Sequence, residues 1–319
     1  MRWEKVLLDH DELRPIWRCL LSVVMILLAY LGIAIALGMV FGGVGRWPRL
    51  LGNLFWLNLC MLPALFGIFK IMTGFFDEKP LASIGVALRG RWRQELGLGL
   101  GLGAAMIFLV AGLERLLGLA TFRWTTDSPQ RVLAVGGFLF VLVLVAASNE
   151  ELVFRGYPFQ RLVDSVGPLA AVAAFSALFG LAHLANPSPT WVSTLNTMLI
   201  GVPLAVAYLR TRSLWMPIGM HFAWNFLEGY VLGLPVSGLA FPAAVAQAES
   251  HGAAWLTGGT YGPEGGLLTT QVIVAATVYL CFSERIYMSE ETKQLLSGPT
   301  IPKQEPAASP AATRGLDDR

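Results

Sequence analysis

Long apolar stretches separated by short polar segments cover most of the sequence. Each stretch is about 20 residues long, which is the length that crosses the hydrocarbon core of a bilayer as a helix. The predicted spans are 19–41, 51–76, 96–119, a helix that begins near residue 133, 168–185, 191–209, 214–234 and 267–282. The pattern therefore predicts an all-α fold, a polytopic membrane bundle of about eight transmembrane helices.

Lysine and arginine are distributed unevenly between the two sides of this bundle. Eight spans put both termini on one side, and that side collects most of the basic residues. The opposite side holds Arg46, Arg49, Arg115, Arg123 and Arg131. Because basic residues favour cytoplasmic loops, we predict that both termini are cytoplasmic. We expect a multi-pass protein of the plasma membrane, which in a bacterium is the inner membrane.

The chain divides into three parts by composition. Residues 1–17 form a polar, cytoplasmic N-terminal segment, and residues 18–285 form the transmembrane helical domain. Residues 286–319 are predicted to form a cytoplasmic and largely disordered tail, because proline, alanine, serine and charged residues follow one another there without periodicity.

The amino-acid composition limits the environment and the binding partners that we expect for the protein. With 55% hydrophobic and 14% charged residues, the chain does not have the composition of a soluble globular protein. A net charge of +2 gives no indication of nucleic-acid binding. Cys19, Cys60 and Cys281 lie in or beside apolar runs without metal-ligand spacing, so we interpret them as core residues. The expected environment is the lipid bilayer, with no nucleic-acid partner.

Two adjacent carboxylates interrupt the fourth apolar helix. Glu150 and Glu151 follow a long apolar run, and Arg155 comes four residues after Glu151. Ionisable groups inside a membrane helix are costly and often mark a functional site. Glu151 and Arg155 share a helix face and can pair, whereas Glu150 points about 100° away. Either one carboxylate is held while the other stays reactive, or both are charges at the point where the helix leaves the bilayer.

A histidine in the fifth helix reaches a similar depth. If the turn between the fourth and fifth helices lies at 166–168, Glu150 and His183 are each about 16 residues, or about 24 Å, from that turn. This arrangement requires the fourth helix to continue beyond Arg155, bent or interrupted at Gly156 and Pro158. Otherwise His183 is an interfacial residue near the end of its helix.

The seventh helix contributes His221 and Asn225. These residues are four apart, so they share one helix face. Their usual role in membrane bundles is hydrogen bonding between helices. The compatible depths of Glu150, His183, His221 and Asn225 favour instead a shared polar cavity within the membrane.

These residues also carry a family resemblance. The ordered motifs are Glu150-Glu151-x-x-x-Arg155, Phe179-x-x-x-His183 and His221-x-x-x-Asn225, each on its own apolar helix. In this order they resemble the CPBP family, which comprises the type II CAAX prenyl endopeptidases, the Abi proteins and the bacteriocin-processing enzymes. Ser176, residues 214–220 and residues 261–266 are also similar to members of that family. The resemblance covers residues 133–266, the motif core of the helical domain, and implies an intramembrane glutamate endopeptidase whose cavity opens to the cytoplasm.

The residues and the resemblance agree on catalytic roles. Glu150, assisted by His183, is expected to activate a water molecule for attack on a peptide carbonyl. His221 and Asn225 are expected to donate hydrogen bonds to the oxyanion, while Arg155 holds Glu151 and through it Glu150. We favour Glu150 as the base, with Glu151 as the alternative. The expected substrate is a membrane-embedded or membrane-associated peptide or protein, and no cofactor or metal is expected.

Three other functions fit some of the same residues. Two histidines and a glutamate could ligate zinc in an intramembrane metalloprotease, although the sequence has no His-Glu-x-x-His motif. Intramembrane glutamate and histidine could relay protons in a proton-coupled transporter, although no internal repeat is found. An immunity or binding protein could use the cavity as a docking site.

Overall fold

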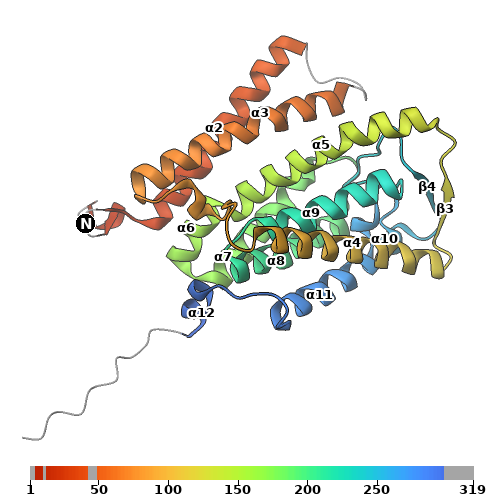
Figure 1. Cartoon of the computed structure of the whole chain (residues 1–319). Helices are drawn as coiled ribbons and strands as arrows, with labels where there is room; N and C mark the ends of the chain where they lie inside the picture. The colour runs from red at the N-terminus through yellow and green to blue at the C-terminus, as the bar shows by residue number, and fades with distance from the viewer. Residues whose placement is uncertain (1–3, 10–11, 42–48, 298–319) are drawn as a thin grey trace, which may run out of the picture.

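Long apolar helices make up most of the molecule (Figure 1). The structure is a computed structural model and describes residues 4–9, 12–41 and 49–297. The long helices are α2 (Pro15–Phe41), α3 (Arg49–Ile71), α4 (Trp92–Leu116), α5 (Pro129–Arg155), α6 (Tyr157–Val166), α7 (Pro168–Ala182), α8 (Trp191–Thr211), α9 (Trp215–Phe226) and α11 (Leu267–Phe282). The prediction of an all-α membrane bundle is confirmed.

Short elements connect and flank these helices. They include α1 (Glu4–Leu7), the paired strands β1 (Leu8–Asp9) and β2 (Glu12–Leu13), the π-helical turns η1 (Met72–Phe76) and η4 (Leu227–Val231), and the 3₁₀ turns η2 (Leu81–Ile84), η3 (His183–Ala185), η5 (Gly259–Tyr261) and η6 (Pro263–Gly265). Two further short helices are α10 (Ala254–Thr257) and α12 (Glu290–Ser297).

Six helical segments of the described residues are long and apolar enough to cross a membrane: 15–41, 51–76, 92–116, 129–166, 168–185 and 191–211. The other two predicted spans are shorter than expected. Helix α9 ends at Phe226 and continues as the π-helical turn η4, and α11 has only 16 residues. Both pack against neighbouring helices of the bundle, α9 against α4 and α5, and α11 against α8 and α4.

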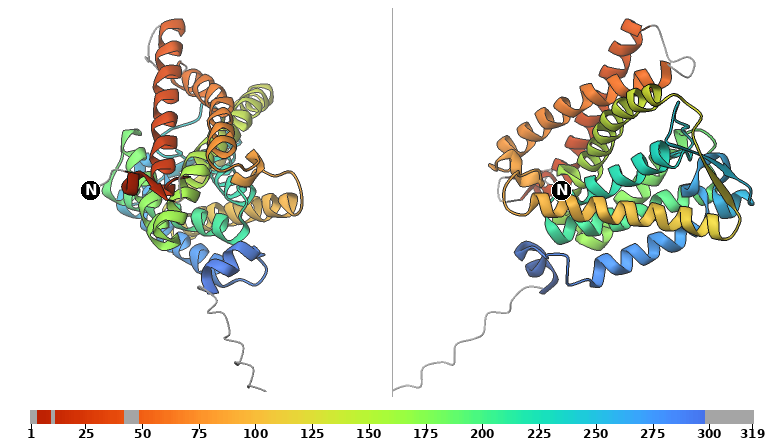
Figure 2. Two further views of the ribbon diagram at one scale, coloured as in Figure 1. Left: turned by 90° about the vertical axis from the view of Figure 1, so that its left-hand side faces the viewer. Right: turned by 45° about the vertical axis from the view of Figure 1, so that its right-hand side comes forward.

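The two ends of the bundle differ. The N-terminal segment and α12 lie at one end, and the antiparallel ribbon of β3 (Ala120–Trp124) and β4 (Ala246–Ser250) lies at the other (Figures 1 and 2). Both strands lie between predicted membrane spans, in segments for which no strand was predicted. Their partners are far apart in the chain, so no local alternation of residues could indicate the pairing.

Part of the predicted tail is ordered against the bundle. Ile286 and Thr292 are buried, and the Arg210 guanidinium of α8 donates hydrogen bonds to the carbonyl oxygens of Cys281 and Ile286. Helix α12 contacts α8. Residues 298–319 of the predicted tail lie outside the described residues.

The predicted interruption of the fourth helix is present. Helix α5 ends at Arg155, and Gly156 adopts a non-helical conformation, with φ −77° and ψ −140°. Helix α6 continues from Tyr157, with Pro158 in its first turn, where proline is tolerated. A Cβ at Gly156 would lie only 2.2 Å from the Leu152 carbonyl oxygen, so the break requires glycine. Gly167, at φ 84°, then turns the chain into α7.

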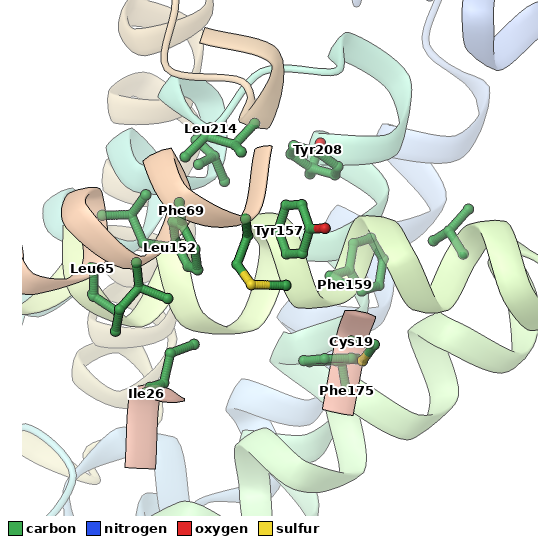
Figure 3. Packing of buried hydrophobic residues seen from close by; sticks show 14 of the residues in the cluster. Cys19, Ile26, Leu65, Phe69, Leu152, Tyr157, Phe159, Phe175, Tyr208 and Leu214 are labelled. Atoms are coloured by element: carbon green, nitrogen blue, oxygen red, sulfur yellow. The ribbon is translucent and has the colours of Figure 1, made fainter. Parts of the chain in front are cut away.

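Aromatic residues of α6 fill the core around this break (Figure 3). The Tyr157 ring stacks on Phe69 of α3, with 6.2 Å between centroids. The Phe159 ring contacts Phe175 of α7 and Tyr208 of α8 edge to face, at 5.6 and 5.9 Å. These contacts connect α6 to three neighbouring helices and fix the path from α5 to α7.

Helices α4 and α9 approach each other closely through glycines. A Cβ at Gly99 would lie 2.1 Å from the Met216 carbonyl oxygen, and one at Gly103 would lie 2.2 Å from that of Met220. Close backbone approach through small residues is common in membrane bundles, and here it fixes the helix that carries His221 and Asn225.

Candidate active site

The two adjacent glutamates lie in different environments. The Glu151 side chain is fully buried, whereas 35% of the Glu150 side-chain surface is exposed. This difference follows from their angular separation on α5, which directs Glu151 into the bundle. Glu150 is therefore the more accessible of the two side chains.

Glu151 is held by two basic side chains. Arg155 Nη1 donates to Glu151 Oε1 at 3.1 Å, and His221 Nδ1 contacts the same oxygen at 2.8 Å. Arg155 Nη2 also donates to the Gly201 carbonyl oxygen of α8, at 3.2 Å. The predicted pairing of Glu151 with Arg155 is thus present. The contact with His221 was not foreseen, and it means that Glu151 orients the histidine of α9.

Glu150 faces both histidines. Its Oε2 atom lies 3.8 Å from His183 Nε2 and 3.7 Å from His221 Nε2. This oxygen is buried and has no hydrogen-bond partner among the described residues. Separations above 3.5 Å between polar groups are commonly bridged by water. Neither distance is a direct hydrogen bond, and the three side chains converge from α5, η3 and α9.

Hydrogen bonds define the proton positions on both rings. His183 Nδ1 lies 2.8 Å from the Phe179 carbonyl oxygen, which can only accept, so Nδ1 carries the proton. His183 Nε2 is then an acceptor in the neutral ring. His221 Nδ1 donates to the Glu151 carboxylate in the same way. His221 Nε2 can donate a second hydrogen bond only when both ring nitrogens carry a proton. The Glu151 carboxylate beside Nδ1 stabilises this charged ring.

The ring of Phe179 lies among these groups. The Arg155 guanidinium carbon is 4.6 Å from the ring centroid, and the His183 ring centroid is also 4.6 Å away. The His221 ring meets Phe179 edge to face, at 6.1 Å. A cation over an aromatic face is attracted to it, so Phe179 helps to position Arg155.

A cavity adjoins the histidines. It is lined by His183, His221 and Asn225, by the polar residues Asn196, Thr197, Ser237, Glu264 and Thr269, and by Gly103, Met106, Phe179, Ile200, Leu204, Met220, Trp224 and Ile273. Glu150 approaches the histidines from α5 and does not line the cavity. His183 and His221 therefore lie between Glu150 and the cavity.

Polar residues from the segment before α11 complete the cavity, and sequence reasoning did not assign them a role. Glu264 Oε2 accepts hydrogen bonds from Ser237 N and Ser237 Oγ, both at 2.6 Å. Asn196 Nδ2 donates to the Glu264 and Gly266 carbonyl oxygens at 2.9 Å. The sequence offers one signal for this region, because Glu264 is an acidic residue within residues 261–266, which resemble the CPBP family.

Two comparisons with known proteins gave no match: neither a curated protein nor a solved structure matches the chain. A scan against family models gave a different result. Residues 133–227 match the family model described as Type II CAAX prenyl endopeptidase Rce1-like. The resemblance inferred from the motifs is confirmed over this segment.

The Rce1-like segment contains all three motifs and supports an intramembrane endopeptidase at the level of the family. Together with the six apolar helices, it identifies an integral membrane protein. Within the described residues, no group of three His, Cys, Asp or Glu side chains is arranged so that it could hold a metal ion.

Proposed function

We propose that the protein hydrolyses a peptide bond of a membrane-embedded or membrane-associated substrate with a water molecule that Glu150 activates. The observation that carries this proposal is the contrast between the two glutamates. Glu151 is buried and bonded to Arg155 and His221, whereas Glu150 Oε2 lacks a partner among the described residues and faces two histidine nitrogens.

The water is oriented by two acceptors. It donates one hydrogen to Glu150 Oε2 and the other to His183 Nε2, which the hydrogen bond to Phe179 leaves unprotonated. Glu150 takes the proton as the water oxygen attacks the carbonyl carbon. A base placed within reach of the water in this way typically contributes about 10²–10⁴-fold to the rate.

The oxyanion that forms is stabilised from α9. Asn225 Nδ2 and the protonated His221 Nε2 supply the donors, and Glu151 balances the positive charge on His221 through its bond to Nδ1. When the intermediate collapses, the carbon–nitrogen bond breaks and the Glu150 carboxyl returns its proton to the leaving amine. One water is consumed, and a carboxylic acid and an amine are released.

A cleavage assay tests the proposal. Purified protein in detergent is given membrane-associated reporter peptides, with and without a metal chelator. Cleavage that persists with chelator and is lost in Glu150→Gln supports glutamate catalysis. Loss of cleavage in chelator, restored by zinc, would instead identify a zinc-dependent protease that uses the same residues.

A further inference from the structure

The cavity beside the histidines has an ionisable group that the proposed reaction does not use. Glu264 lies in the segment between η5 and α11 and is anchored by the backbone N–H and the hydroxyl of Ser237. Both bonds end on Oε2, so Oε1 remains as an acceptor for another group. A carboxylate accepts through both oxygens.

The segment around Glu264 is rigid. Thr269 Oγ1 donates to the Pro263 carbonyl oxygen, and Gly238 N donates to that of Tyr261. A Cβ at Gly262, which has φ 103°, would lie 2.0 Å from the Pro235 carbonyl oxygen. The chain therefore holds the Glu264 carboxylate at a fixed place in the cavity wall.

The rest of the lining is apolar or neutral apart from the two histidines, and the described lining includes no lysine or arginine. Met106, Leu204, Met220 and Trp224 supply apolar surface. His221 is already bonded to Glu151 through Nδ1. Burial raises the pKa of Glu264, although the bonds from Ser237 and the nearby histidines oppose that effect. A bound cation would favour the ionised form of Glu264.

We infer that Glu264 is a specificity-determining residue, which selects a substrate with a cationic side chain beside the scissile bond. The inference rests on the proposed peptide hydrolysis, because the cavity adjoins its histidines. The apolar walls suit the methylene stem of lysine or arginine, and Glu264 Oε1 accepts from the charged end. Buried charges require such a partner.

Reporter peptides that differ at one position test this inference. Lysine, norleucine or glutamate is placed in turn at each of the two positions on either side of the scissile bond. At one of these positions the wild-type kcat/KM for lysine should exceed that for norleucine by about tenfold or more, because a desolvated charge pair forms. Glu264→Gln should lower the ratio of kcat/KM for lysine to that for norleucine to about one.

The control is Glu249→Gln, which removes an exposed carboxylate of β4 outside the cavity and should keep the preference for lysine. Equal kcat/KM for lysine and norleucine at all positions would overturn the inference, as would a lysine preference that survives Glu264→Gln. Cleavage of the norleucine peptide by wild type reports on the proposed function separately.

Binding of a cation at Glu264 can also be measured without any substrate cleavage. n-Hexylammonium should raise the unfolding temperature of the wild type more than n-hexanol does, because a ligand that binds the folded state stabilises it. The difference should vanish in Glu264→Gln and persist in Glu249→Gln. If both ligands act equally on the wild type, Glu264 does not recognise a cation.

Discussion

Single residues of the candidate site fall into two groups, those with hydrogen-bond partners in the structure and those that line the cavity. Glu151 belongs to the first group because Arg155 and His221 both bind it within the bundle. Asn225 belongs to the second, since it shares a helix face with His221 and lines the cavity. The two groups should respond differently to substitution.

Glu151→Gln should destabilise the protein. Removing one partner of a buried ion pair typically costs about 3–5 kcal/mol, and here it also weakens the bond to His221. A matched control is Glu114→Gln, because Glu114 is equally buried but neither carboxylate oxygen has a hydrogen-bond partner among the described residues. That variant should be as stable as the wild type or more so. Thermal unfolding in detergent measures both, and equal losses would contradict the assignment of Glu151.

Asn225→Ala should lower kcat and kcat/KM together by about 10²–10³-fold, with little change in KM, because an oxyanion donor acts mainly in the transition state. Steady-state kinetics on a cleavable reporter peptide measures these constants. A variant that keeps wild-type kcat and loses only thermal stability would assign Asn225 to helix packing.

At the scale of helices, the contact of α4 with α9 fixes two of the site residues. Gly99→Ala would place a methyl group against the Met216 carbonyl oxygen, where a Cβ lies 2.1 Å away. Overpacking of this kind costs about 1–3 kcal/mol. We expect lower stability and, because α9 carries His221 and Asn225, lower turnover.

Gly101→Ala provides the control on the same helix. Nothing lies within 4 Å of a Cβ at Gly101, so the variant should keep full activity and gain about 0.5–1 kcal/mol of helix stability. Unfolding and activity measured on both variants make the comparison. If Gly99→Ala behaves like Gly101→Ala, the close approach of α4 and α9 does not control the site.

The positions of the helices and strands also show which features of the fold could be predicted from the sequence. Apolar length located the helices, and the depth argument brought Glu150 and His183 together because the break at Gly156 lies where the glycine and proline indicated it. The contact between Glu151 and His221 joins residues 70 positions apart, and the β3–β4 ribbon joins segments even further apart. Such pairings depend on the relative rotation and packing of whole elements, which local patterns do not specify.

For the whole molecule, the arrangement of the two ends supports the predicted topology. The N-terminal segment and α12 lie at the same end, opposite the β3–β4 ribbon (Figure 1). The excess of basic residues at that end favours the cytoplasm. A protease added outside intact cells should therefore leave a C-terminal epitope tag untouched. Efficient removal of the tag would reverse the topology and the side on which the site opens.

The decisive experiment compares Glu150→Gln with wild type in the reporter-peptide assay, with thermal unfolding recorded on the same preparations. An amide cannot take the proton from water, and Glu150 Oε2 has no hydrogen-bond partner to lose among the described residues. Turnover should disappear while the unfolding temperature stays close to that of the wild type. A stable Glu150→Gln variant that still cleaves the peptide would contradict the assignment of Glu150 as the base.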